Sequence, residues 1–295
     1  MDNPALLAPA SAMETRVIDA HQHFWREPLP WMTGPYAMIA EAYGPNDLRP
    51  LLAAAGVDAT VLVQVSHSLY ETTEFLAIAE RTEFVAGVVG WVPLDQPDIA
   101  DILAPLRAGP NGRWLVGVRH LVHDEADPEW LLRPEVRRGL AAVADAGLVF
   151  DLLARPRELP ACVAIARDFP DLRLVLDHIG KPEIAAGTRE PWATDIAAFA
   201  QHAQVRCKLS GLVSEANHET WSLHDLRPYV AHAIDVFGAE RCMFGSDWPV
   251  CRVAAVYGAV KVALETILDD LGVTGAARAA IMGETAARTY DLPAA

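Results

Sequence analysis

The chain has 295 residues, of which 52% are hydrophobic and 21% charged, the composition of a globular protein and not of a disordered one. Its formal net charge of −15 argues against nucleic acid or an anionic membrane as a partner, because both need a cationic face. No apolar run approaches the roughly 18 residues of a membrane helix, and residues 1–15 lack a signal-peptide pattern. We expect a flexible tail there, free cysteines, a cytoplasmic location and a small-molecule partner. The oligomeric state stays open.

Short β-branched runs predict eight strands along the chain, at 17–22, 60–65, 84–91, 115–119, 148–153, 173–178, 205–210 and 242–247. Alanine- and leucine-rich segments with helical spacing lie between these runs, and two more follow the last one. Strand–helix alternation predicts parallel strands. Eight such units predict a (β/α)8 barrel over residues 16–295 as one domain. An open doubly wound sheet is the alternative, but it lacks a glycine-rich loop after the first strand.

Polar residues fall where the predicted strands end, which is where chemistry gathers in such a barrel. They are His21, His23, Gln64, Arg119, Asp151, His178, Lys208 and Asp247. Side chains alternate along a strand, so we expect Asp19, His21 and His23 on one face of the first strand. On the sixth strand we expect His178 on one face and Asp177 on the other.

Three histidines and a carboxylate from the first, sixth and eighth strands are therefore expected to converge. Such a set binds Zn²⁺ with one open position, or holds a carbonyl oxygen by its imidazoles. The carboxylate of Asp247 is then a candidate base for activating water. Simpler roles remain open: Asp247 as a helix cap or turn residue, and His178 as the partner of a backbone carbonyl. His67 is undecided, and for the other six histidines, His120, His123 and His224 among them, we expect surface positions.

Four motifs, "DAHQHFW", "LDHIGKP", "CKLSGL" and "MFGSDWPV", resemble in this order the lactonase group of the amidohydrolase superfamily, from about residue 16 to residue 291. The resemblance implies a distorted (β/α)8 barrel. His21 and His23 match the HxH motif of the first strand, His178 matches the histidine of a later strand, and Asp247 matches the aspartate that acts as general base.

The resemblance also bears on the metal. The fourth and fifth strands offer Arg119 and Asp151 and no obvious bridging lysine, and the seventh carries Lys208 and no histidine. We therefore expect at most one divalent ion such as Zn²⁺, with His21, His23, His178 and Asp247 as its candidate ligands. Whether this ion is held firmly, held weakly or not required stays open, and we expect substantial activity after chelation.

The resemblance implies a hydrolase that opens the cyclic ester of a small sugar acid. Asp247 takes a proton from water, and the three histidines stabilise the oxyanion. We expect Arg119, Gln64, Trp25, Trp248 and Lys208 to hold the sugar. Few arginines lie near the mouth, which favours an aldonolactone such as L-fucono-lactone over a dicarboxylate. The alternatives are a metal-dependent decarboxylase or amide hydrolase, and a non-catalytic sugar-acid-binding barrel.

Overall fold

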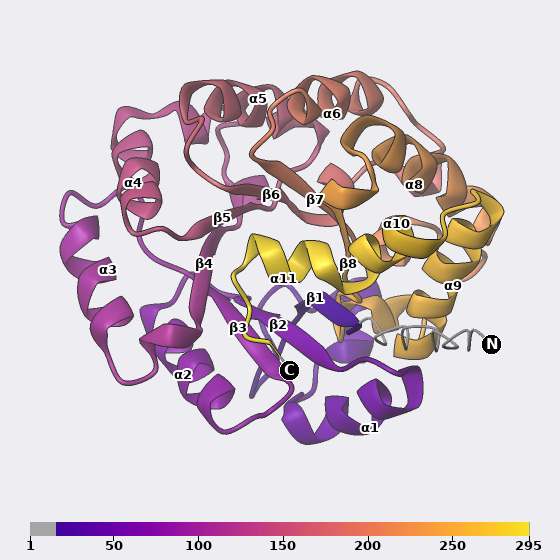
Figure 1. The fold of residues 1–295 in the computed structure, drawn as a ribbon, viewed down its shortest axis with the longest axis horizontal. Helices are drawn as coiled ribbons and strands as arrows, with labels where there is room; N and C mark the ends of the chain where they lie inside the picture. The colour runs from indigo at the N-terminus through magenta and orange to yellow at the C-terminus, as the bar shows by residue number, and fades with distance from the viewer. Residues whose placement is uncertain (1–15, 295) are drawn as a thin grey trace, which may run out of the picture.

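The structure, a computed structural model, describes residues 16–294. Eight strands form one sheet in chain order, each parallel to the next. The sheet curls into a barrel with helices outside it (Figure 1). The strands are β1 (Ile18–Gln22), β2 (Ala59–Val63), β3 (Val85–Gly90), β4 (Leu115–His120), β5 (Val149–Leu152), β6 (Leu174–Leu176), β7 (Val205–Leu209) and β8 (Cys242–Phe244). The prediction of a (β/α)8 barrel is confirmed.

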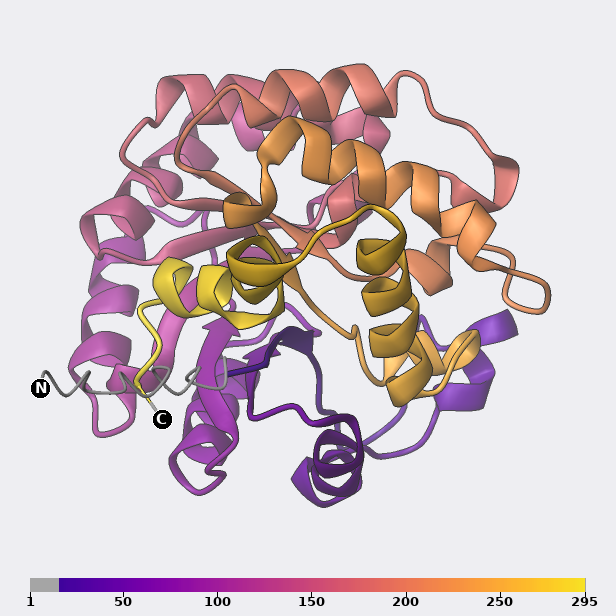
Figure 2. The same ribbon diagram turned by 45° about the vertical axis from the view of Figure 1, so that its right-hand side comes forward.

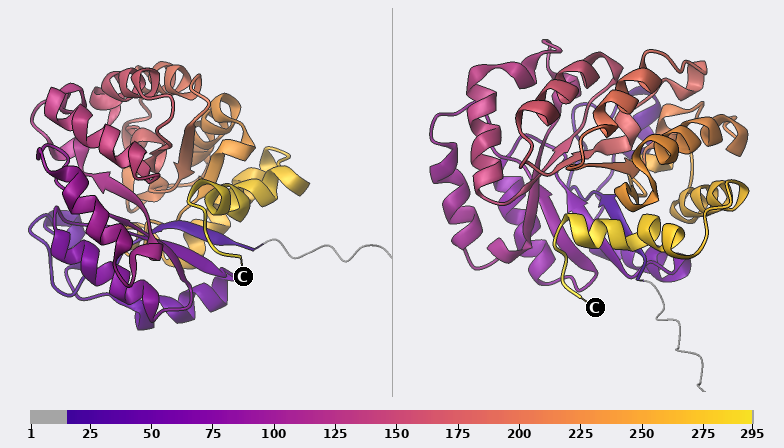
Figure 3. Two further views of the ribbon diagram at one scale, coloured as in Figure 1. Left: turned by 60° about the vertical axis from the view of Figure 1, so that its left-hand side comes forward. Right: turned by 45° about the horizontal axis from the view of Figure 1, so that its top comes forward.

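Helices follow every strand and form a ring around the barrel, as the rotated views show (Figure 3). They are α1 (Pro45–Ala55), α2 (Leu69–Glu80), α3 (Ile99–Ala108), α4 (Pro134–Asp145), α5 (Leu159–Asp168), α6 (Trp192–Ala200), α7 (Leu212–Glu215), α8 (Leu223–Phe237), α9 (Tyr257–Asp270), α10 (Gly275–Ala279) and α11 (Thr285–Thr289). A π-helical turn, Ala280–Glu284, joins the last two. None of the helices within residues 16–294 has the length and apolar character needed to cross a membrane.

Two apolar layers flank the sheet. Small and β-branched side chains, together with Met243, fill the inside of the barrel; they include Ile18, Ala20, Val61, Val63, Val149 and Val175. Larger residues of the same strands, such as Leu62, Phe150 and Phe244, pack outward against the helices. Because side chains alternate along a strand, the next inward position on several strands lies above the inner layer, at the C-terminal end of the barrel.

The barrel closes between β1 and the segment after β8. The backbone amide of Asp247 donates to the carbonyl of His21 (2.8 Å), and the amide of His23 donates to the carbonyl of Trp248 (2.7 Å). The closing contacts therefore lie beyond the last residue of β8. They place Asp247 beside the two histidines of β1 through the backbone itself.

The C-terminal helical segment covers the opposite end of the barrel, where the strands begin (Figures 1 and 2). The hydroxyl of Thr285 donates to the carbonyl of Glu240, just before β8 (3.1 Å). The guanidinium of Arg173, just before β6, donates to the carbonyl of Thr289 (2.9 Å). Tyr290 follows α11, and its side chain belongs to the inner apolar layer.

The strand bounds differ from the predicted ones at the sites of chemistry. β6 ends at Leu176 and β8 at Phe244, earlier than the expected 178 and 247. His178 and Asp247 have φ values of 54° and 58°, and a left-handed backbone does not continue a strand. The predicted N-terminal tail, residues 1–15, lies outside the described residues.

Candidate active site

A register shift in β1 aims both histidines of the HxH motif at the barrel mouth. Asp19 pairs with Thr60, but Gln22 pairs with Leu62, so β1 gains one residue on β2 between these pairs. The extra residue breaks the simple alternation. As a result His21 and Ala20 both face inward, and the expectation that Asp19 shares the face of the histidines is wrong. The Asp19 carboxylate points outward and accepts a hydrogen bond from Tyr257 of α9 (3.1 Å).

The end of β6 also departs from the predicted alternation. Val175 belongs to the inner layer, while Leu174 and Leu176 pack outward. The inward position above Val175 is therefore Asp177, which the sequence analysis placed on the other face. His178 reaches the site because its left-handed backbone turns the chain after the strand. Both residues thus contribute to one site, whereas alternation predicted only one of them.

Asp247 lies at the centre of the histidine cluster. Its Oδ1 is 3.3 Å from Nε2 of His23, 3.8 Å from Nε2 of His178 and 3.9 Å from Nε2 of His21. The three histidines and Asp247 are all at most 4% exposed. The predicted convergence of three histidines and one carboxylate is therefore what the structure shows.

A layer of buried charges lies directly below this cluster. Lys208 Nζ is 2.5 Å from Asp151 Oδ2 and 3.0 Å from Asp177 Oδ1. Arg119 Nη1 is 2.9 Å from Asp177 Oδ2 and 3.1 Å from Nε2 of His21. Buried charges are tolerated when they are paired in this way. The layer links the cluster to the strands β4, β5 and β7.

The tautomers of His21, in β1, and His23, just after it, follow from their outer partners. His23 Nδ1 donates to the carbonyl of Val63 (2.7 Å), and His21 Nδ1 lies 3.3 Å from Asp177 Oδ1. Their Nε2 atoms then carry lone pairs, and these atoms are only 3.1 Å apart. A carboxylate behind a histidine is a common outer partner of a metal ligand.

The donor set fits one divalent cation. Nε2 of His21, Nε2 of His23 and Oδ1 of Asp247 lie within 4.8 Å of one another, and all three residues are buried. Two converging nitrogen lone pairs and a carboxylate are ligands that Zn²⁺ accepts. A second group, His21, Asp177 and His178, has similar spacing. Its Asp177 is already neutralised by Lys208 and Arg119, so this group does not suit a second divalent ion.

Burial decides the charge of the cluster. It lowers the pKa of His21 and of His178 well below 6.5, and the nearby Asp177 and Asp247 offset only part of this effect. Burial also acts to raise the pKa of Asp247, but His178, His23 and Lys181 lower it by more, so that this pKa lies below 3.8. At neutral pH the site therefore holds neutral imidazoles at His21 and His178 beside a carboxylate at Asp247.

A cavity of ≈ 230 Å³ opens above the cluster. His23, His178, Asp247 and Arg119 line its floor, and apolar side chains such as Leu121 and Leu153 line one wall. The rim carries Trp31, Tyr36 and Lys181, for which the sequence indicated no role, His123, which was expected on the surface, and Arg155, which was expected near the mouth. They come from the connections after the strands, including the short 3-10 helices Gly34–Ile39 and Val122–Asp124, where no strand alternation or motif spacing marks a residue as facing the site.

The predicted sugar-binding residues divide into two groups. Arg119 lines the cavity. Trp25 and Trp248 do not line it; their rings pack edge-on against Tyr43 in the apolar core. Gln64 is fully buried and donates to the carbonyl of Arg119 (3.3 Å). Lys208 is fully buried below the cavity, so the structure places it behind His21 instead of against a ligand.

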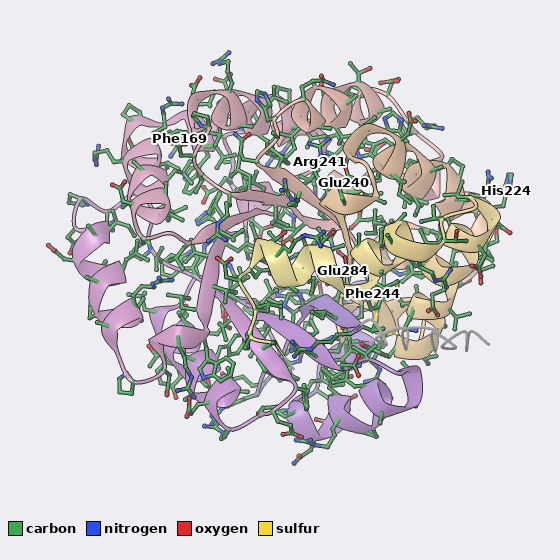
Figure 4. All side chains as sticks on the ribbon, in the orientation of Figure 1. Phe169, His224, Glu240, Arg241, Phe244 and Glu284 are labelled. Atoms are coloured by element: carbon green, nitrogen blue, oxygen red, sulfur yellow. The ribbon has the colours of Figure 1, made fainter. Side chains whose placement is uncertain are left out.

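Two of the histidines expected on the surface are elsewhere. His120 is 5% exposed, and its ring stacks between those of His67 and Trp130 at 4.1 and 4.0 Å. His123 lines the cavity. Both follow from β4 continuing to His120, so that this end of the strand lies in the mouth of the barrel. His224 of α8 is exposed and points away from the barrel, as predicted (Figure 4).

The cysteine prediction is confirmed within residues 16–294. All four cysteines are free and buried. The fold and the cluster together define an amidohydrolase-type barrel: an HxH motif on β1, a histidine after β6 and an aspartate after β8. The comparisons with known proteins agree with this class.

The family model described as Amidohydrolase matches residues 18–292. The chain is 43% identical over 244 residues to L-fucono-1,5-lactonase of Burkholderia ambifaria, which covers 82% of this chain and 83% of that protein. It is 37% identical over 289 residues to L-fucono-1,5-lactonase of Burkholderia multivorans, covering 94% and 96%. A crystal structure of an amidohydrolase from Burkholderia multivorans with bound zinc has a TM-score of 0.88 at 36% identity, covering 94% of this chain and all of that one. The chain belongs to the amidohydrolase family.

Proposed function

We propose that the protein is a lactonase, a carboxylic ester hydrolase that opens the cyclic ester of a small sugar acid with an activated water. The observation that carries the proposal is the convergence of His21, His23, His178 and Asp247 on one small cavity. Relatives that share this family and most of the chain are L-fucono-1,5-lactonases. A base beside electrophilic groups is what ester hydrolysis requires.

Asp247 is the proposed general base. Its carboxylate is charged at neutral pH and faces the cavity. Because its pKa is low, it accepts the proton only as the water oxygen bonds to the lactone carbon, when that proton becomes acidic. The carboxylic acid so formed then returns the proton to the ring oxygen as the acyl–oxygen bond breaks.

Arg119 and His178 are the proposed partners of the oxyanion. Arg119 lines the cavity while Asp177 holds its Nη1, so the guanidinium presents a fixed positive charge. The Nδ1 of His178 lies 2.9 Å from the hydroxyl of Ser210, which leaves its Nε2 to face the cavity. Donors held in place before the reaction stabilise the developing negative charge without reorganisation.

We propose His21, His23 and Asp247 as the ligands of one divalent ion. His178 is not counted among them, because an Nε2 that donates its proton to the oxyanion has no lone pair for a metal. When bound, such an ion supplies a polarised lactone carbonyl and a more acidic water. Asp177 then fixes the His21 ring, and the carbonyl of Val63 fixes the His23 ring. Zinc in a related amidohydrolase supports this assignment.

For the substrate we propose L-fucono-1,5-lactone or a similar aldonolactone. A cavity of ≈ 230 Å³ suits a single sugar ring. Its apolar wall, Leu121 and Leu153, suits the methyl group of a deoxy sugar, and the polar rim of Tyr36, Arg155 and Lys181 suits hydroxyl groups. A cytoplasmic location is proposed from the free, buried cysteines.

The test is proton release from a panel of lactones: L-fucono-1,5-lactone, L-rhamnono-lactone, stereoisomeric aldonolactones and 2-pyrone-4,6-dicarboxylate. We expect the highest kcat/KM for the first or a close stereoisomer, since this ratio measures discrimination. Preference for the dicarboxylate would correct the substrate class. Absence of turnover on every lactone, with metal supplied and the protein folded, would reject the lactonase.

A further inference from the structure

Tyr290 connects the far end of the barrel with the active site. It follows α11, which lies across the end where the strands begin (Figures 1 and 2). Its ring is 1% exposed and packs among the inner apolar residues of the barrel. Its hydroxyl reaches up to Asp151, 2.9 Å from each carboxylate oxygen. Burial and Asp151 raise the pKa of Tyr290 well above 10, so the phenol keeps its proton and donates it.

Asp151 in turn contacts Lys208. Lys208 Nζ is 2.5 Å from Asp151 Oδ2, and it also lies above the ring of Tyr290, 5.4 Å from its centre. The same ammonium group is 3.0 Å from Asp177 Oδ1 and 3.2 Å from Nδ1 of His21. Tyr290, Asp151, Lys208 and His21 thus form one continuous chain of buried polar contacts.

Two groups compete for Nδ1 of His21. Asp177 Oδ1, at 3.3 Å, accepts a proton from this nitrogen, whereas Lys208 Nζ, at 3.2 Å, donates one to it. If Asp177 is the partner, the proton stays on Nδ1 and Nε2 offers its lone pair to the site. Nη1 of Arg119 lies 3.1 Å from Nε2 of His21, and because a guanidinium only donates, this contact also favours a lone pair on Nε2. The second hydrogen bond of a histidine decides its tautomer in this way.

We propose that Tyr290 is a positioning residue of the active site: its hydroxyl orients Asp151, Asp151 holds Lys208, and Lys208 in turn keeps Asp177 in place against Nδ1 of His21. Lys208 is held toward β5, so Asp177 remains the partner of His21. The C-terminal segment is then part of the catalytic apparatus although it lies at the opposite end of the barrel. This inference rests on the proposed function for its kinetic readout, and on the proposed metal ligands for its second one.

The test is Tyr290→Phe, which keeps the ring and removes only the hydroxyl. Loss of an outer partner of a metal ligand costs roughly 10–100-fold in activity or metal affinity, and we expect about 10-fold in kcat, with KM nearly unchanged. We also expect Zn²⁺ to bind less tightly, measured by competition with a chromogenic chelator. The matched control is Tyr229→Phe, whose hydroxyl donates to the carbonyl of Thr188 outside the barrel (3.1 Å).

A double-mutant cycle with Asp151→Asn separates positioning from general loss of stability. If Tyr290 acts through Asp151, its hydroxyl adds less than about twofold to the loss in that background, because coupled residues are not additive. Three outcomes would overturn the proposal. The first is additive losses of kcat in the double mutant, and the second is wild-type kcat and zinc affinity in Tyr290→Phe. The third is a loss in Tyr229→Phe as large as that in Tyr290→Phe. If the wild type turns over no lactone, the proposed function fails, and the zinc competition still decides the role of Tyr290.

Discussion

Asp151 on β5 and Asp19 on β1 are both fully buried, and each accepts a hydrogen bond from a tyrosine hydroxyl of the C-terminal part of the chain. Burial raises the pKa of both carboxyl groups above 3.8. They differ in the face of the barrel to which they point. Asp151 points inward and contacts the ammonium group of Lys208. Asp19 points outward and accepts from the amide and the hydroxyl of Ser246 (2.8 and 2.6 Å).

This difference shows that the role of a buried carboxylate depends on the groups that it contacts. The neighbour of Asp151 is a cation that reaches Asp177 and His21, so changes at Asp151 affect the position of a site residue. Asp19 accepts from the amide and hydroxyl of Ser246, after β8, and from the backbone amide of His21 (3.1 Å), so it contacts the backbone of a site residue but not its imidazole. Changes at Asp19 therefore affect the junction at which the barrel closes.

The largest effect is expected at Asp247, where the junction and the site meet. Its amide bonds to the carbonyl of His21 at the junction, while its carboxylate faces the cavity. Asp247→Asn keeps the backbone contact and removes the base. We expect kcat to fall by roughly 10²–10⁴, with the melting temperature close to that of the wild type. A variant that keeps a near wild-type rate would remove Asp247 from the mechanism.

Removal of the metal is expected to lower the activity less than Asp247→Asn does. Lys208 and Arg119 neutralise Asp177 of the second ligand group, so we predict at most one divalent ion per chain by elemental analysis. Chelation should leave substantial activity, because Arg119 and His178 still line the cavity beside Asp247. Two equivalents of metal, or activity that is abolished by chelation and restored by metal, would contradict this prediction.

The smallest effect on activity is expected for Tyr257→Phe, the outer counterpart of Tyr290→Phe. It removes one of the donors to Asp19 and no contact within the site. We expect a loss of about 1–3 kcal/mol in the free energy of unfolding, the cost of weakening a hydrogen bond to a buried charged group. Urea unfolding measures this loss, and kcat should stay within about twofold. A large fall in kcat without loss of stability would erase the distinction between the two carboxylates.

Strand–helix alternation was sufficient to predict the barrel, because eight β-branched runs separated by helical segments fit few other folds. The ends of the strands were harder. Alternation failed at Asp19, because the register shift of β1 depends on its pairing with β2. On β6 alternation leads from Val175 to Asp177, but it fails at His178, because the strand ends early in a left-handed turn. Neither the register shift of β1 nor the early end of β6 can be predicted from the local sequence.

The candidate site was predictable to the extent that its motifs lie at strand ends. His21, His23, His178 and Asp247 converge as expected. Trp25 and Trp248 lie next to these motifs in the sequence, but the prediction that they hold the sugar is wrong, because their rings pack in the apolar core. Rim residues such as Tyr36 come from the connections between strands and helices, and the contact of Tyr290 with Asp151 joins residues 139 positions apart. Such contacts follow from topology, not from spacing.

The most direct test of the account is the initial rate of proton release from L-fucono-1,5-lactone, measured for the wild type and for Asp247→Asn, with the spontaneous ring opening subtracted. Both proteins should be folded by circular dichroism. The account predicts clear enzymatic turnover by the wild type and a rate lower by at least about 100-fold in the variant. A wild type that does not exceed the spontaneous rate, or a variant that equals the wild type, would contradict it.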